Sequence, residues 1–141
     1  MQNRYGEYQF DDDPARLDLD RVCRLLADTY WAAARAKTTV AASIAHSLPY
    51  GVYCHDAQVG FARVITDLST IFWLCDVVIA PEHRQQGLGK QLVAFILSDP
   101  RLQGLNAFLA TRDADGLYAR FGFEKSDWFM HRPAPKSQNR E

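Results

Sequence analysis

Residues 74–92 read LCDVVIAPEHRQQGLGKQL, and this stretch decides the fold of the 141-residue chain. Its first part belongs to the run 71–79, the most β-prone and most continuously apolar segment, which is typical of a central strand covered on both faces. After a turn with two glycines, apolar residues recur at helical spacing at Leu88, Leu92, Val93, Phe95 and Ile96. The stretch therefore predicts a buried strand, a turn at 81–89 and an amphipathic helix that stops before Pro100.

The other segments extend this unit in both directions. Residue patterns and turn signals predict further strands at 5–10, 50–54, 59–66, 105–110 and 123–131. They predict one helix capped by Asp18, a second over 38–46 capped by Thr38 or Thr39, and a short one from Asp113 to Phe121 ended by Gly122. We expect a mixed α/β fold (α+β), with a mostly antiparallel central sheet of about six or seven strands flanked by about four helices.

Length and composition indicate one globular domain. Apolar residues make up 48% of the chain, aromatic residues 12% and charged residues 23%, which excludes a disordered, collagen-like or coiled-coil chain. Sixteen Lys and Arg against seventeen Asp and Glu give a net charge of −1, so nucleic acid is disfavoured as a partner. We expect the domain to cover residues 1–132 and residues 133–141 to form a flexible tail.

The sequence also argues against disulfides, metals and membranes. The three cysteines are widely spaced without a Cys-x-x-Cys pair, and the four histidines do not stand at metal-ligand spacing. The N-terminus is polar, and the apolar-rich stretch 71–80 is far shorter than the roughly 20 residues of a membrane span. We therefore expect a reduced, cytoplasmic protein with no metal, no export signal and no membrane partner.

The turn between the central strand and its helix has the features of an anion site. The first turn of a helix carries unpaired N–H groups and the positive end of the helix dipole, and Gly87 and Gly89 let a phosphate approach the backbone. Arg84 adds a cation at the rim. Because Leu92 stands where a Rossmann fingerprint has a glycine, and no Gly-Lys-Ser/Thr follows, NAD and ATP are poorer candidates. Tight helix–sheet packing without a ligand is the alternative.

Two motifs resemble a known family. The stretch 74–92 is similar to the central motif of the GNAT superfamily of N-acetyltransferases, and GLYARFGF at 116–123 resembles that superfamily's second landmark. GFARVITD at 60–67 is similar to a bacterial GNAT subgroup without a well-defined substrate. The resemblance implies acetyl-coenzyme A as co-substrate and a primary amine of a small molecule or peptide as acceptor. A non-catalytic acyl-coenzyme A sensor, or partner module, is the alternative.

The resemblance also implies where the donor binds. Backbone N–H groups of the turn, with Arg84 at its rim, would hold the pyrophosphate, and the residues are Arg84, Gln85, Gln86, Gly87, Leu88, Gly89 and Lys90. The pantetheine arm would pair with the backbone of Val77, Val78 and Ile79, with an N–H near Val78 polarising the thioester carbonyl. The side chains of these strand residues are expected to lie in the core.

Tyr118 matches the family's general acid for the departing thiolate, and a packed tyrosine without chemistry is the alternative. An amine acceptor must lose a proton, and Asp76, Glu82, His83 and Asp67 are candidate bases. Asp76 interrupts an apolar strand, so it is either this base or a hydrogen-bonded structural carboxylate.

The resemblance further implies an acceptor cleft between the first helices and the central strands. The residues expected to contact the acceptor are Trp31, Phe61, Arg63 and Trp73. Placement in the core is the alternative for each aromatic residue, whereas a buried Arg63 requires a partner such as Asp67 or an anionic acceptor group. Edge strands that pair between subunits make a homodimer possible.

Overall fold

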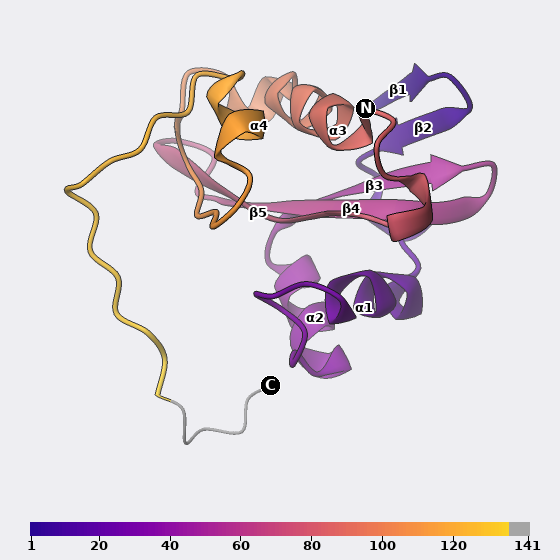
Figure 1. Cartoon of the computed structure of the whole chain (residues 1–141), viewed down its shortest axis with the longest axis horizontal. Helices are drawn as coiled ribbons and strands as arrows, with labels where there is room; N and C mark the ends of the chain where they lie inside the picture. The colour runs from indigo at the N-terminus through magenta and orange to yellow at the C-terminus, as the bar shows by residue number, and fades with distance from the viewer. Residues whose placement is uncertain (136–141) are drawn as a thin grey trace.

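The computed structural model describes residues 1–135, which form one six-stranded sheet with helices on both faces (Figure 1). The strands lie in chain order across the sheet: β1 (Gln2–Tyr5), β2 (Tyr8–Asp11), β3 (Leu48–Cys54), β4 (Ala57–Thr66), β5 (Ile71–Ile79) and β6 (Asn106–Phe108). The α-helices are α1 (Leu19–Ala27), α2 (Lys37–Ala45), α3 (Leu88–Leu97) and α4 (Asp115–Ala119). Neighbouring strands are antiparallel except β5 and β6, which are parallel. The expected mixed α/β fold with a mostly antiparallel sheet is confirmed.

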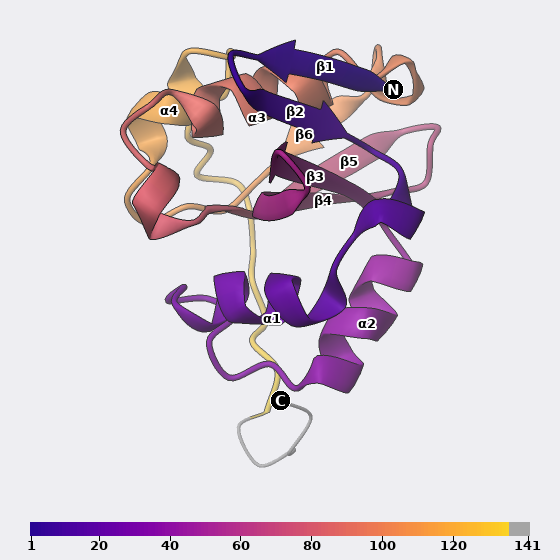
Figure 2. The same ribbon diagram turned by 90° about the vertical axis from the view of Figure 1, so that its right-hand side faces the viewer.

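The helices form a layer on each side of the sheet. Helices α1 and α2 cover one face, and α3 and α4 cover the other (Figures 1 and 2). Val22 and Leu26 of α1, like Leu92 and Ile96 of α3, are at most 2% exposed. The predicted cap of α1 is confirmed, since the Asp18 carboxylate accepts a hydrogen bond from the backbone N–H of Arg21 at 3.1 Å. β5 is therefore covered on both faces, as its continuous apolar pattern predicted.

Three local predictions are wrong. The strand expected at 5–10 is the hairpin of β1 and β2, because Gly6 takes a left-handed φ of 60° and reverses the chain. Helix α2 begins at Lys37, so Thr38 and Thr39 lie within its first turn rather than capping it. Helix α4 begins at Asp115 after Ala114, without a cap from the Asp113 side chain.

The segment 123–131 is not a strand, although its sequence predicts one. It leaves α4 through Gly122, whose φ of 86° ends the helix as predicted, and then runs as irregular extended chain. A β-prone segment becomes a strand only where a neighbouring strand supplies hydrogen-bond partners, and no such pairing is found for it within residues 1–135. Of the tail expected at 133–141, residues 136–141 lie outside the described part of the chain.

No helix in the described part of the chain combines the length and the apolar composition needed to cross a bilayer.

Candidate functional site

A cleft opens where β5 and β6 diverge. β6 pairs only with residues 71–73 of β5, so within residues 1–135 the β5 edge from Leu74 to Ile79 has no partner strand on that side. The cleft has a volume of about 1160 Å³, and it is bounded by β5, the start of α3, α4 and the connection between α1 and α2. An open strand edge presents backbone donors and acceptors in a row. An extended ligand in this cleft can therefore pair with the backbone of β5.

A β-bulge shapes the part of β5 that faces the cleft. Phe61 lies opposite Val78 and Arg63 lies opposite Cys75, so β5 carries one more residue than β4 between these pairs. The irregularity includes Asp76, whose φ of 58° is in the left-handed region. Bulges bend a strand and redirect its groups, and strained non-glycine residues concentrate at functional sites. The backbone is thus redirected at the point where β5 borders the cleft.

The Asp76 carboxylate is buried and accepts hydrogen bonds from three side chains. Oδ1 accepts from Trp31 Nε1 at 2.9 Å, and Oδ2 accepts from Arg35 Nη1 at 2.7 Å and from Arg63 Nε at 2.6 Å. Burial raises the pKa of this carboxyl, but the hydrogen bonds from Arg35 and Arg63 outweigh burial and hold the pKa below its usual value. Asp76 is therefore an ionised carboxylate that ties β4 and the α1–α2 connection to the bulge.

The turn before α3 lines the cleft through Arg84, Gln85 and Gly87. Arg84 Nε donates to the carbonyl of Ile79 at 2.9 Å, which fastens the turn to the end of β5. Gln85 and Gly87 both take left-handed φ values, 64° and 78°. α3 then begins at Leu88 without a side-chain cap. The positive end of this helix therefore faces the cleft, as an anion site requires.

Tyr118 lies on α4 and lines the cleft, as do residues 74–79 of the open edge of β5. Its ring packs edge-to-face on Phe123, with the centroids 6.0 Å apart. Burial, with smaller contributions from Tyr30 and Asp113, raises the pKa of the phenol to about 12. The phenol therefore keeps its proton throughout the neutral range and can donate a hydrogen bond into the cleft.

Most residues predicted for the donor line this cleft. They are Val77, Val78, Ile79, Arg84, Gln85, Gly87, Leu88, Gly89 and Lys90. Gln86 is the exception among the predicted set, because it turns toward β2, where its Oε1 accepts a hydrogen bond from the Tyr8 phenol at 3.2 Å.

The residues predicted for the acceptor divide into two groups. Trp31 and Trp73 line the cleft. Phe61 is a core residue with no exposed surface, which its alternative interpretation anticipated, so a ligand cannot contact it in this conformation. Arg63 is buried and outside the cleft lining, and its carboxylate partner is Asp76 rather than Asp67.

Three of the four candidate bases lie outside the cleft lining and have other partners. Asp67 accepts hydrogen bonds from the backbone N–H groups of Ser69 and Thr70 in the β4–β5 turn. Glu82 pairs with Arg21 at 3.4 Å. His83 Nδ1 lies 2.9 Å from the Tyr8 phenol oxygen.

Trp31 was predicted from the sequence, but the side chains that line the cleft with it were missed, and these are Tyr30, Arg112, Asp28 and Asp113. Tyr30 and Trp31 are more than 40% exposed and meet edge-to-face with centroids 4.9 Å apart. The Arg112 guanidinium lies 3.9 Å from the Tyr30 ring centroid, and the Arg112 backbone N–H donates to the Tyr30 phenol at 3.0 Å. Exposed carboxylates of Asp28 and Asp113 lie beside them. The sequence signal that could have revealed this group is the consecutive Tyr30 and Trp31 in a loop between two helices, because large aromatic side chains in a loop have no helix or strand face that would bury them in the core.

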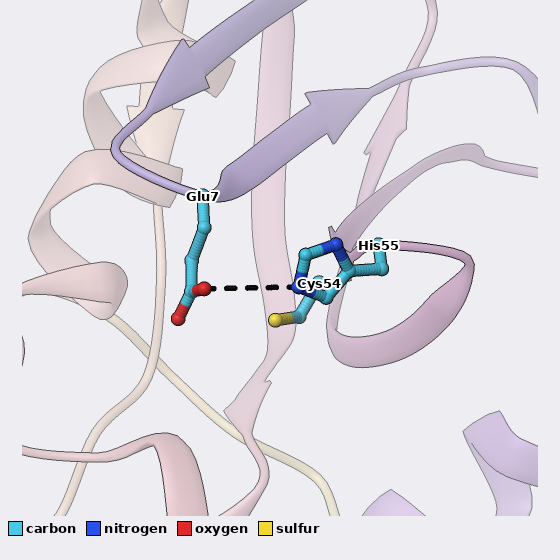
Figure 3. A group of neighbouring side chains, drawn as sticks. All are labelled: Glu7, Cys54 and His55. Carbon is cyan, nitrogen blue, oxygen red and sulfur yellow. Dashed lines mark ion pairs between the residues drawn. The ribbon is translucent and has the colours of Figure 1, made fainter.

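A separate group of metal-ligating side chains lies where two hairpin turns meet. Glu7, Cys54 and His55 bring ligand atoms within 4.8 Å of one another (Figure 3). The Glu7 Oε2–His55 Nε2 ion pair spans 3.7 Å, with both side chains more than half exposed. The ion pair is sufficient to explain why Glu7 and His55 lie close together without a metal. The expectation that the protein binds no metal stays a prediction.

Comparisons with known proteins agree with this arrangement. Residues 45–125 match the model of the acetyltransferase (GNAT) domain family. A crystal structure assigned to the GNAT family from Xanthomonas campestris pv. campestris is 40% identical, with a TM-score of 0.87 over 92% of this chain and 95% of that one. A GCN5-related N-acetyltransferase from Ralstonia eutropha JMP134 is 18% identical with a TM-score of 0.65, covering 91% and 97% of the two chains, and shows the fold alone.

The curated relatives match a smaller part of this chain than the solved structures do. The uncharacterized N-acetyltransferase ycf52 of Gracilaria tenuistipitata var. liui is 37% identical over 46% of this chain, and an acetyltransferase-like protein of Gibberella zeae, FG08082, is 28% identical over 70% of it. The chain spans 37% and 66% of the lengths of these two relatives. The family model covers more than half of the chain and includes β5, the turn and α4. The chain therefore belongs to the GNAT acetyltransferase family.

Proposed function

We propose that this protein transfers an acetyl group directly from acetyl-coenzyme A to a primary amine. The observation that carries the proposal is the meeting, in one cleft, of an open strand edge and an uncapped helix start. An extended amide-rich arm requires the first, and a pyrophosphate requires the second. Coenzyme A is one ligand that has both parts.

The bulge and Tyr118 would carry the chemical step. The amine nitrogen attacks the thioester carbonyl, the C–N bond forms, and the C–S bond breaks to release coenzyme A and a proton. A backbone N–H near Val78 would stabilise the oxyanion, and Tyr118 would donate a hydrogen bond to the departing sulfur. The carboxylates of Asp28 and Asp113, which line the cleft, would attract the acceptor as an ammonium ion, and the ammonium would lose one proton to water before its nitrogen attacks. Asp76, tied to two guanidinium groups, would position the bulge.

Release of free coenzyme A thiol from acetyl-coenzyme A tests the proposal. We expect release that depends on an added amine, across a panel of polyamines, amino acids, aminoglycosides, arylamines and lysine peptides. Calorimetric titration with coenzyme A should show binding in parallel. Donor binding without transfer to any amine would favour the alternative, an acyl-coenzyme A sensor, and absence of donor binding would contradict both.

A substitution in the turn tests the donor site. Gly87→Ala places a side chain at φ 78°, which costs about 1–2 kcal/mol for an L-residue and pulls the turn toward negative φ. The added Cβ meets only Tyr5 Oη, at 3.5 Å, so strain rather than a clash is the effect. We expect the Kd for coenzyme A to rise about tenfold, the equivalent of 1.4 kcal/mol, measured by calorimetric titration.

Gly104→Ala is the matched control. Gly104 has the same φ of 78° and open space around its Cβ position, but it lies outside the cleft lining. Its alanine variant should lose similar stability and bind coenzyme A as the unmodified protein does. Equal Kd values for the two variants would contradict a pyrophosphate site in this turn.

A further inference from the structure

A second cavity adjoins the cleft, and Tyr118 lines both spaces. It has a volume of about 700 Å³ and lies between β6, α4 and the chain that follows α4. The two spaces share four lining residues, which are Trp73, Ala110, Thr111 and Tyr118. Tyr118 therefore lies on the wall that separates this cavity from the cleft.

The walls of this cavity are mainly aromatic. Trp73 lies opposite Phe108 in the parallel pairing of β5 and β6, and their rings stack with centroids 6.4 Å apart and an interplanar angle of 10°. The Phe129 ring packs against the same indole, with the centroids 5.5 Å apart and an interplanar angle of 32°. Stacked rings held by strand register form a flat apolar surface, which favours a planar or apolar ligand group.

The rim of the cavity leaves large apolar side chains in solvent. Trp128, Phe129 and Met130 are consecutive and are 84%, 54% and 93% exposed. Exposed apolar residues in such a patch mark a binding surface more often than a free one. These residues lie on the segment 123–131, whose strand-like sequence was not explained by the sheet.

The charges around the cavity suit a cationic amine better than an anion. The Lys125 ammonium is paired with Asp115 at 2.8 Å, and Glu124 adds a further carboxylate to the lining. Asp113 lines the neighbouring cleft, and its carboxylate lies near enough to Tyr118, which lines both spaces, to contribute to the raised pKa of the phenol. An ammonium group is therefore attracted toward the shared wall, while its apolar part is attracted to the aromatic surface.

We propose that this cavity binds the body of the acceptor, and that the acceptor is a primary amine attached to an aromatic group or an apolar group of similar size. The aromatic group lies against Trp73, Phe108 and Phe129, and the amine lies at the shared wall beside Tyr118. This inference rests on the proposed acetyl transfer and specifies its substrate class. The ammonium first loses one proton to water, and the amine nitrogen then forms a C–N bond to the acetyl carbon as the C–S bond breaks. The second proton that the nitrogen loses passes to the sulfur, so that coenzyme A leaves as the thiol.

Amines that differ only in the group they carry test this inference. We expect 2-phenylethylamine and tryptamine to show kcat/KM values at least tenfold above those of ethylamine and 1,4-diaminobutane in the coenzyme A release assay. Binding is measured separately, by calorimetric titration of 2-phenylethylamine into the protein saturated with coenzyme A. Transfer to the diamine with no preference for arylalkylamines would leave the proposed function standing and overturn the cavity assignment.

Phe129→Ala locates the binding site. Phe129 is about half exposed, so its loss should not unfold the protein, and the KM for 2-phenylethylamine should rise about tenfold with the KM for acetyl-coenzyme A unchanged. Leu68→Ala is the control, because Leu68 is 53% exposed on the β4–β5 turn, outside both linings. No binding of 2-phenylethylamine to the unmodified protein, or equal binding by the Phe129 variant, would overturn the proposal. The proposal would also be overturned if sedimentation showed that the unmodified protein is a dimer and that the Phe129→Ala variant is a monomer.

Discussion

Asp76→Asn is expected to lower the free energy of unfolding by about 3–5 kcal/mol, because it leaves the guanidinium groups of Arg35 and Arg63 without their shared buried carboxylate. Asparagine tolerates the left-handed φ of 58° as aspartate does, so the change isolates the charge from the backbone conformation. Denaturant unfolding measures the loss. The KM for the acceptor should rise as well, since the Asp76 carboxylate also fixes the indole of Trp31.

Asp20→Asn is the matched control for burial. Asp20 pairs with Lys37 at 2.6 Å, the same distance as the Asp76–Arg63 pair, but both side chains are about 60% exposed. Exposed pairs contribute between about 0 and 1 kcal/mol, so this variant should unfold almost as the unmodified protein does. If the two variants lose equal stability, the carboxylate of Asp76 does not have the structural role assigned to it.

The Asp76→Asn variant also distinguishes a positioning role for Asp76 from a role as the general base. Because the folded-state pKa of Asp76 is depressed, its contribution to stability is present above the unfolded value near 3.9 and is lost as the pH falls through the folded pKa. The stability difference between Asp76→Asn and the unmodified protein should therefore shrink below about pH 4. Full stability with turnover abolished at every pH would instead identify Asp76 as the general base.

The sequence predicted the strand, turn and helix that form the proposed donor site because the signals for these elements are local. An apolar strand, two glycines and an amphipathic helix follow one another within residues 71–97, and the turn that they define is the turn in the structure. Because backbone groups of the strand and the turn would bind the donor, the prediction did not depend on the orientation of individual side chains. Only Gln86 of the predicted turn residues points elsewhere, toward Tyr8 on a strand far away in the sequence.

The acceptor side depends on contacts between distant segments, which the sequence pattern does not encode. Arg63 could be expected to need a carboxylate, but Asp67 is nearer in sequence, whereas the bulge brings Asp76 to it. Phe61 and Trp73 are both aromatic residues in predicted strands, so the sequence does not distinguish them. The register of β4 on β5 and the layer of helices determine that Phe61 is buried and that Trp73 lines the cleft. The strand predicted at 123–131 failed for the same reason, since a strand requires a neighbour.

Tyr118→Phe is expected to lower kcat by about 10²-fold, with the Kd for coenzyme A nearly unchanged, because it removes a single hydrogen-bond donor aimed at developing charge. Burial raises the pKa of this phenol to about 12, well above the value of about 8.5 for a thiol. Complete proton transfer to the departing sulfur would therefore be uphill, so in the proposed mechanism the phenol shares its proton with the sulfur as the C–S bond breaks. Steady-state kinetics and calorimetric titration measure the two quantities.

The pH dependence and a second tyrosine make this prediction specific. Since the Tyr118 phenol keeps its proton up to about pH 11, the kcat of the unmodified enzyme should show no basic limb from it between about pH 7 and pH 10. Tyr50→Phe is the control, because Tyr50 is fully buried and donates to Asp99 at 2.7 Å, away from the cleft. That variant should lose stability and keep kcat. Unchanged turnover in Tyr118→Phe would show that the phenol only packs against Phe123, and that the backbone of β5 carries the catalysis without it.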